Sequence, residues 1–79
     1  MLELEKIERG KDYISCTAFV EGCKQGIRVS INKDGDLKEE VALPEGYEWC
    51  KNHISRAIRF LTSLWSEEQV PKRKTIMWY

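Results

Sequence analysis

The chain has no excess of charge of either sign, since 13 basic and 13 acidic side chains give a formal net charge of zero. This balance removes the whole-chain electrostatic argument for nucleic-acid binding, although it leaves room for a local basic surface. Long apolar runs are missing too. Uncharged stretches such as Phe60 to Ser66 are far too short to span a bilayer, and the N-terminus lacks the cationic and apolar regions of an export signal. We therefore expect no membrane association.

Cysteine and histidine are scarce, with three cysteines and one histidine. An odd number of cysteines at irregular spacing is a poor disulfide framework, which favours a reducing, cytoplasmic location. Cys50 and His53 lie one helical turn apart, and Cys16 and Cys23 could complete a four-ligand zinc set. Structural zinc sites usually take their ligands in close pairs from turns, however, whereas Cys16 falls in the middle of a strand pattern. We interpret these residues as core and predict no metal and no cofactor.

Catalytic motifs are also lacking. No helix follows the glycines at 22 and 26, so they do not form a phosphate loop, and Asp34-Gly35-Asp36 fits a hairpin turn better than a calcium loop. His53 could activate Cys50 as a nucleophile, but a chain of 79 residues can hardly enclose a cleft with an oxyanion site. We therefore expect that the protein is not an enzyme.

Alternating hydrophobic and polar residues predict several strands. One runs from Tyr13 to Glu21 and another from Ile27 to Asn32, joined by a turn that carries two glycines. After the Asp34-Gly35 turn, a third strand is predicted over Leu37–Leu43, at an edge or with a late start because Glu39 interrupts its pattern. An additional strand over Leu2 and Leu4 is left open.

The clearest predicted element is an amphipathic helix over Tyr47 to about Ser66. Its apolar residues recur at steps of three and four, and the helix follows the break at Pro44. After Pro71, a final strand is predicted in which Ile76 and Trp78 share one side. The expected fold is α+β: one small domain over residues 1–79, with three or four antiparallel strands packed on one helix in the order β-β-β-α-β.

Basic residues concentrate in the second half of the chain. Residues 1–48 contain seven Lys and Arg against eleven Asp and Glu, whereas residues 49–79 contain six against two. Cations combined with aromatic faces suit nucleic acid, whose phosphates need positive charge and whose bases stack on rings. The candidate nucleic-acid-binding residues are Arg56, Arg59, Lys72, Arg73, Lys74 and Trp78. The alternative interpretation is that the helix carries an ordinary solvated face and that Trp78 belongs to the core.

A second candidate surface is the side of the sheet that faces away from the helix. Alternation places aromatic and sulfur-containing side chains there, and an exposed patch of this kind often marks an interface with another protein or a second copy. The candidate protein-interaction residues are Tyr13, Phe19, Met77 and Tyr79. The alternative is that the Leu2-Leu4-Ile7 segment covers this face. We expect a small interaction or regulatory module that binds a protein partner or forms a homodimer; the alternative is a nucleic-acid-binding accessory protein.

Overall fold

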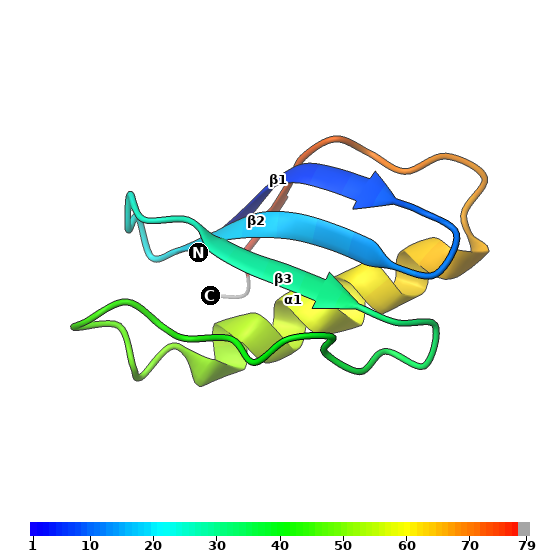
Figure 1. The fold of residues 1–79 in the computed structure, drawn as a ribbon. Coiled ribbons are helices and arrows are strands. Elements are labelled where there is room, and N and C mark those ends of the chain that lie inside the picture. Colours follow the sequence, from blue (N-terminus) through cyan, green and yellow to red (C-terminus); the bar gives the residue numbers. More distant parts are fainter. Residues whose placement is uncertain (78–79) are drawn as a thin grey trace.

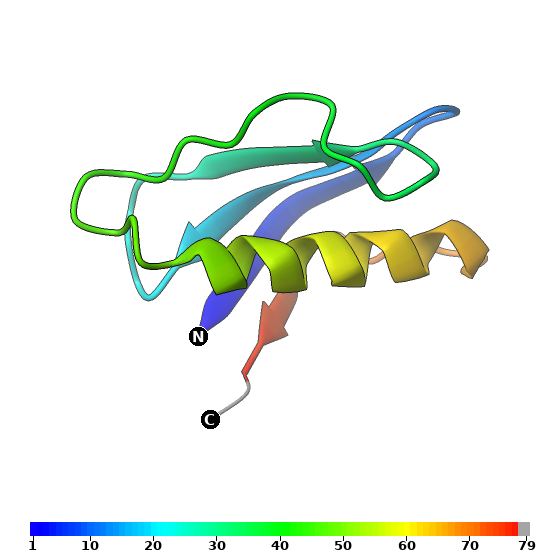
Figure 2. The same ribbon diagram turned by 90° about the horizontal axis from the view of Figure 1, so that it is seen from below.

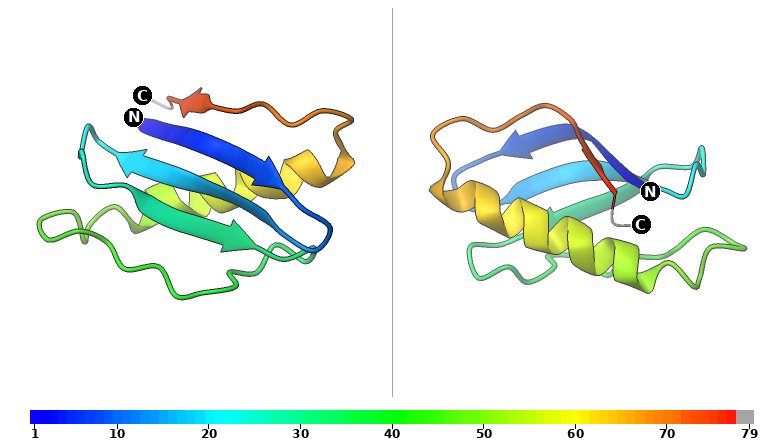
Figure 3. Two further views of the ribbon diagram at one scale, coloured as in Figure 1. Left: turned by 45° about the horizontal axis from the view of Figure 1, so that its top comes forward. Right: turned by 180° about the vertical axis from the view of Figure 1, so that it is seen from behind.

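The computed structural model describes residues 1–77, which form one antiparallel sheet and one helix (Figure 1). The elements are β1 (Leu2–Arg9), β2 (Ile14–Val20), β3 (Ile27–Ile31), α1 (Lys51–Ser63), the short 3-10 helix η1 (Leu64–Ser66) and β4 (Lys74–Ile76). The four strands lie in the order β3-β2-β1-β4. α1 lies against one face of the sheet (Figures 2 and 3). The predicted α+β class and the order β-β-β-α-β are confirmed, but the three strands before the helix include Leu2–Arg9 in place of the predicted strand over Leu37–Leu43.

The core lies between the sheet and α1. On each of the three long strands, alternate side chains point toward the helix and are buried, as expected for strands with one covered face. On α1, residues spaced by three and four face back toward them. The fully buried side chains are Leu2, Leu4, Ile14, Cys16, Ala18, Val20, Val29, Ile31, Cys50, Ala57 and Leu61.

The N-terminal segment forms an inner strand of the sheet, so the strand left open by the sequence is present. The alternative that Leu2, Leu4 and Ile7 cover the far face is wrong, because all three are at most 5% exposed within the core on the helix side. A bulge makes this possible. The register with β2 shifts between Glu5 and Glu8, and Lys6 adopts a left-handed φ of 52°. The extra residue turns Ile7 inward instead of Lys6.

The strand predicted over Leu37–Leu43 is not formed. Only Leu37 makes an isolated bridge, to Ile31, and the backbone N–H of Lys38 donates to the carbonyl of Ser30. The following charged residues, Lys38 to Glu40, are all exposed. Two successive glutamates cannot alternate between solvent and a buried face, and the chain therefore leaves the sheet edge as a loop.

Two other boundaries differ from prediction. The helix begins at Lys51 instead of Tyr47, because residues 45–50 form turns around Gly46, which has a φ of 87°. The last strand spans only Lys74–Ile76, pairing with β1 so that Leu2 faces Ile76. Trp78 and Tyr79, which the sequence assigned to the two candidate surfaces, lie outside the described residues.

Candidate nucleic-acid interface

The solvent-facing side of α1 carries a single polar stripe. Asn52, Ser55, Arg56 and Arg59 are spaced by three and four residues, and together they line a shallow open depression of about 320 Å³. The sequence of the helix, KNHISRAIRFLTS, contains three Lys and Arg residues and no acidic one. All four residues of the stripe are exposed. Two predicted site residues, Arg56 and Arg59, are thus brought together on one face.

Lys74 of β4 extends this positive region. Its Nζ lies 5.8 Å from the centre of the Phe60 ring, within the range of a cation–π interaction. Phe60 is one helical turn beyond Arg56, so the last strand places a cation beside the helix. We call Lys51, Arg56, Arg59 and Lys74 the basic helix surface.

Lys72 and Arg73 do not join the basic helix surface through any contact that the structure shows. The guanidinium of Arg73 lies 3.8 Å from a carboxylate oxygen of Glu5 on β1, and both groups are partly or largely exposed. The carbonyl of Lys72 accepts a hydrogen bond from the backbone N–H of Ile7. Lys72 and Arg73 line one open depression with Glu5 and Glu8, and Arg73 and Lys74 line another with Glu3 and Glu5. Acidic side chains of β1 therefore accompany these cations.

The described members of the other candidate surface are also separated. Tyr13 and Phe19 share the outer side of the sheet but are six residues apart, about 20 Å along an extended strand. Tyr13 packs over Gly10 and lies under the ammonium group of Lys38 at 5.7 Å. Both aromatic residues are half-buried, whereas Met77 is 67% exposed. Hydroxyl side chains at positions 15 and 17 lie between the two rings.

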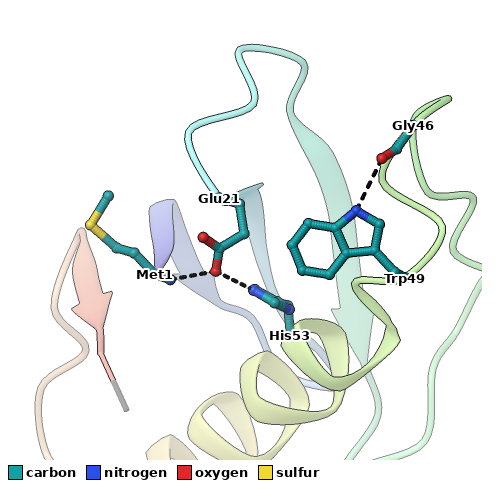
Figure 4. Close-up of polar contacts among 5 residues, drawn as sticks. All are labelled: Met1, Glu21, Gly46, Trp49 and His53. Carbon is teal, nitrogen blue, oxygen red and sulfur yellow. Dashed lines mark hydrogen bonds and ion pairs between the residues drawn. The ribbon is translucent and has the colours of Figure 1, made fainter. Parts of the chain in front are cut away.

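At the N-terminal end of α1, His53 binds Glu21, which immediately follows β2 (Figure 4). Nε2 of the buried His53 ring donates to Oε1 of Glu21 at 2.7 Å, and the amine of Met1 donates to the same oxygen at 2.6 Å. The hydrogen bonds from His53 and from the amine lower the pKa of Glu21. The sequence predicted that His53 belongs to the core but gave no partner for it, since Glu21 is 32 residues away.

Cys16 and Cys50 are poor nucleophiles in this environment. Burial raises the pKa of Cys16 to about 12, despite the opposing charge of Arg28. Burial also raises the pKa of Cys50, and the charge of Glu21 adds to this increase. Both thiols therefore stay protonated near neutral pH. Within residues 1–77, no group of three or more His, Cys, Asp or Glu side chains is arranged to hold a metal ion.

Because its pKa is lowered in the folded state, Glu21 should make stability depend on pH. The unfolded chain binds the proton more readily, so the contribution is present above the ordinary glutamate pKa and is lost as pH falls through the lowered value. Urea unfolding between about pH 6 and pH 3 should show a wild-type advantage over Glu21→Gln that shrinks with acid. Glu40→Gln, at an exposed site outside any ion pair within residues 1–77, is the matched control. An advantage that is constant with pH would contradict this role.

Comparisons with known proteins return no match: no family model, no curated protein and no solved structure resembles the chain. Among residues 1–77, no helix has the length and apolar character needed to cross a membrane. The basis for a function is therefore the geometry of the surfaces described above.

Proposed function

We propose that the protein binds nucleic acid through the basic helix surface. The observation that supports this most is the depression on α1, which is lined by two arginines and two neutral polar residues on a helix without a carboxylate. Guanidinium groups bind phosphate oxygens in a bidentate manner, and amide and hydroxyl groups add neutral hydrogen bonds. Lys51 and Lys74 flank this stripe and extend the positive charge.

Binding of this kind is dominated by contacts with the phosphate backbone of the nucleic acid and does not depend on the base sequence. If the four cations of the basic helix surface each neutralise one phosphate, the logarithm of the binding constant should fall with the logarithm of salt concentration with a slope of about −3 to −4. Affinity should accordingly be highest at low salt. A chain with zero net charge can still carry such a surface, because the basic residues are in excess in one half of the chain. Residues 49–79 contain six Lys and Arg against two Asp and Glu.

The test is a fluorescence anisotropy titration of labelled single- and double-stranded oligonucleotides at about 50 mM salt. We expect the double variant Arg56→Glu/Arg59→Glu to bind at least about tenfold more weakly than wild type, because two phosphate contacts become repulsive. Lys11→Glu/Lys24→Glu is the matched control, since it makes the same charge change at two exposed positions outside the helix. Circular dichroism checks that both variants fold.

Two outcomes would contradict the proposal. One is the absence of wild-type binding to either oligonucleotide at that salt concentration, where phosphate contacts are strongest. The other is an equal loss of affinity in both double variants, which would mean that net charge matters and the helix surface does not.

A protein partner or a second copy, bound to the outer side of the sheet, is the second candidate. It is favoured by the observation that no element within residues 1–77 covers that side, as the two views of Figure 3 illustrate. Phe19 and Met77 lie toward the same end of this face, because Glu3 pairs with both Phe19 and Thr75. The measurement that addresses self-association is the molar mass by light scattering at high concentration, where a monomer would contradict it.

A further inference from the structure

Trp49 is a large apolar side chain that the core does not use. It is 64% exposed, whereas the core side chains of the sheet and of α1 are buried. It is also absent from the cluster of side chains packed on the core. An indole that contributes so little to packing adds exposed apolar area without an evident gain in stability, and tryptophan is enriched at binding interfaces.

The ring is nevertheless held in place (Figure 4). Its Nε1 donates to the carbonyl of Gly46 at 3.1 Å. Its centre lies 5.7 Å from that of the His53 ring, with the two planes at 87° in an edge-to-face arrangement. His53 is in turn fixed by Glu21. A ring that is exposed but already oriented loses little conformational entropy when a flat ligand stacks on it.

Trp49 lies in the turn that leads into the helix carrying the basic stripe. It precedes Asn52 by three residues and Arg56 by seven, and the turn that contains it runs directly into α1, with the N–H of Cys50 bonded to the carbonyl of Tyr47. From Asn52 to Arg59 the stripe is about 10 Å long at the helical rise per residue, and Trp49 stands before its first residue. An aromatic face followed by cations is the arrangement that binds a stacked base and the phosphates beside it.

We propose that Trp49 is the base-stacking platform of the surface and that its preferred ligand is single-stranded nucleic acid. This inference rests on the proposed function and specifies its ligand class. Bases of a duplex are paired and stacked, so they cannot reach an indole beside a helix, whereas an unpaired base can lie on it. The neighbouring phosphates would then follow Arg56 and Arg59. Glu45 and Glu48, both exposed before the helix, disfavour phosphates in the segment that precedes it.

The experiment compares a labelled 12-nucleotide thymidine strand, the matching uridine strand and a 12-base-pair duplex in anisotropy titrations at about 50 mM salt. Trp49→Ala should weaken binding of the single strands about tenfold, since one stacked base is lost, and change duplex binding less than twofold. Trp49→Phe should retain most of the affinity. Met77→Ala is the matched control, because Met77 is also a large exposed apolar side chain. The two single strands reveal whether DNA or RNA is preferred.

The outcomes separate this inference from the function on which it rests. If Arg56→Glu/Arg59→Glu loses affinity but Trp49→Ala binds single strands as wild type does, the stacking role is wrong and the phosphate-binding surface stands. Equal weakening of single-strand and duplex binding by Trp49→Ala would also contradict the stacking role of Trp49. If wild type binds none of the three probes, both proposals fail. Because Trp49 is mostly exposed, the alanine variant should fold, and its thermal unfolding curve verifies this.

Discussion

Replacing Leu61 with alanine is expected to lower the free energy of unfolding by about 2–5 kcal/mol. Leu61 lies in the last half of α1 and is 0% exposed, packed between the helix and the sheet. Truncation removes its buried methyl groups and leaves a cavity that the surrounding strands can fill only in part. Alanine is itself a good helix former, so the backbone of α1 is not the cause of the loss. A chain of this length has a net stability of only about 4–12 kcal/mol.

Urea denaturation followed by circular dichroism measures this effect. Asn52→Ala is the control, because Asn52 is exposed on the same helix and shares the improvement in helix propensity. The midpoint of Leu61→Ala should shift strongly and that of Asn52→Ala only slightly. Similar small shifts in both variants would mean that α1 does not contribute to the core as described.

Replacing Arg9 with methionine should cost about 1–3 kcal/mol. Arg9 ends β1, and its guanidinium donates to the carbonyls of Leu64 and Glu67, each at 2.6 Å, and of Glu68 at 3.2 Å. The carbonyls of Glu67 and Glu68 follow the end of η1, whereas that of Leu64 also accepts the backbone N–H of Glu67. A cation at the C-terminal end of a helix also interacts favourably with the helix dipole. Methionine preserves the aliphatic stem but removes all three donors.

The matched control for this variant is Lys11→Met, which removes one positive charge from an exposed position in the following turn. Arg9→Met should be clearly less stable than the control in urea, and more so at low salt because part of the effect is electrostatic. Equal stability of the two variants would show that water satisfies these carbonyls just as well.

The sequence predicted the elements whose burial follows a simple period. The hairpin of β2 and β3 and the helix were recognisable because Ile27, Val29 and Ile31 alternate and because the apolar residues of α1 recur at steps of three and four. β1 was harder. Leu2 and Leu4 alternate, but Ile7 is out of phase, since the bulge at Lys6 inserts one residue. A periodic pattern cannot reveal such an insertion.

The candidate surfaces show a similar division. Arg56 and Arg59 could be placed on one side of the helix from their spacing alone. The position of Arg73 and Lys74 beside Glu3 and Glu5 required the register of β4 against β1, which is set by pairing between distant segments. Trp49 was assigned to the interior of a longer predicted helix. Its exposure depends on the turns over residues 45–50, which continue past the break predicted at Pro44 and delay the start of α1 to Lys51.

The position of β4 also has consequences for how the chain folds. β1, β2 and β3 are joined by short turns, whereas the pairing of β1 with β4 joins residue 2 to residue 76 and closes a loop containing almost the whole chain. Contacts between such distant segments carry a larger entropic cost than local ones, so we expect them to form after the hairpins and the helix. Lys74 reaches Phe60 only once β4 has docked. The complete basic helix surface is therefore a property of the fully assembled chain, and partly folded molecules lack it.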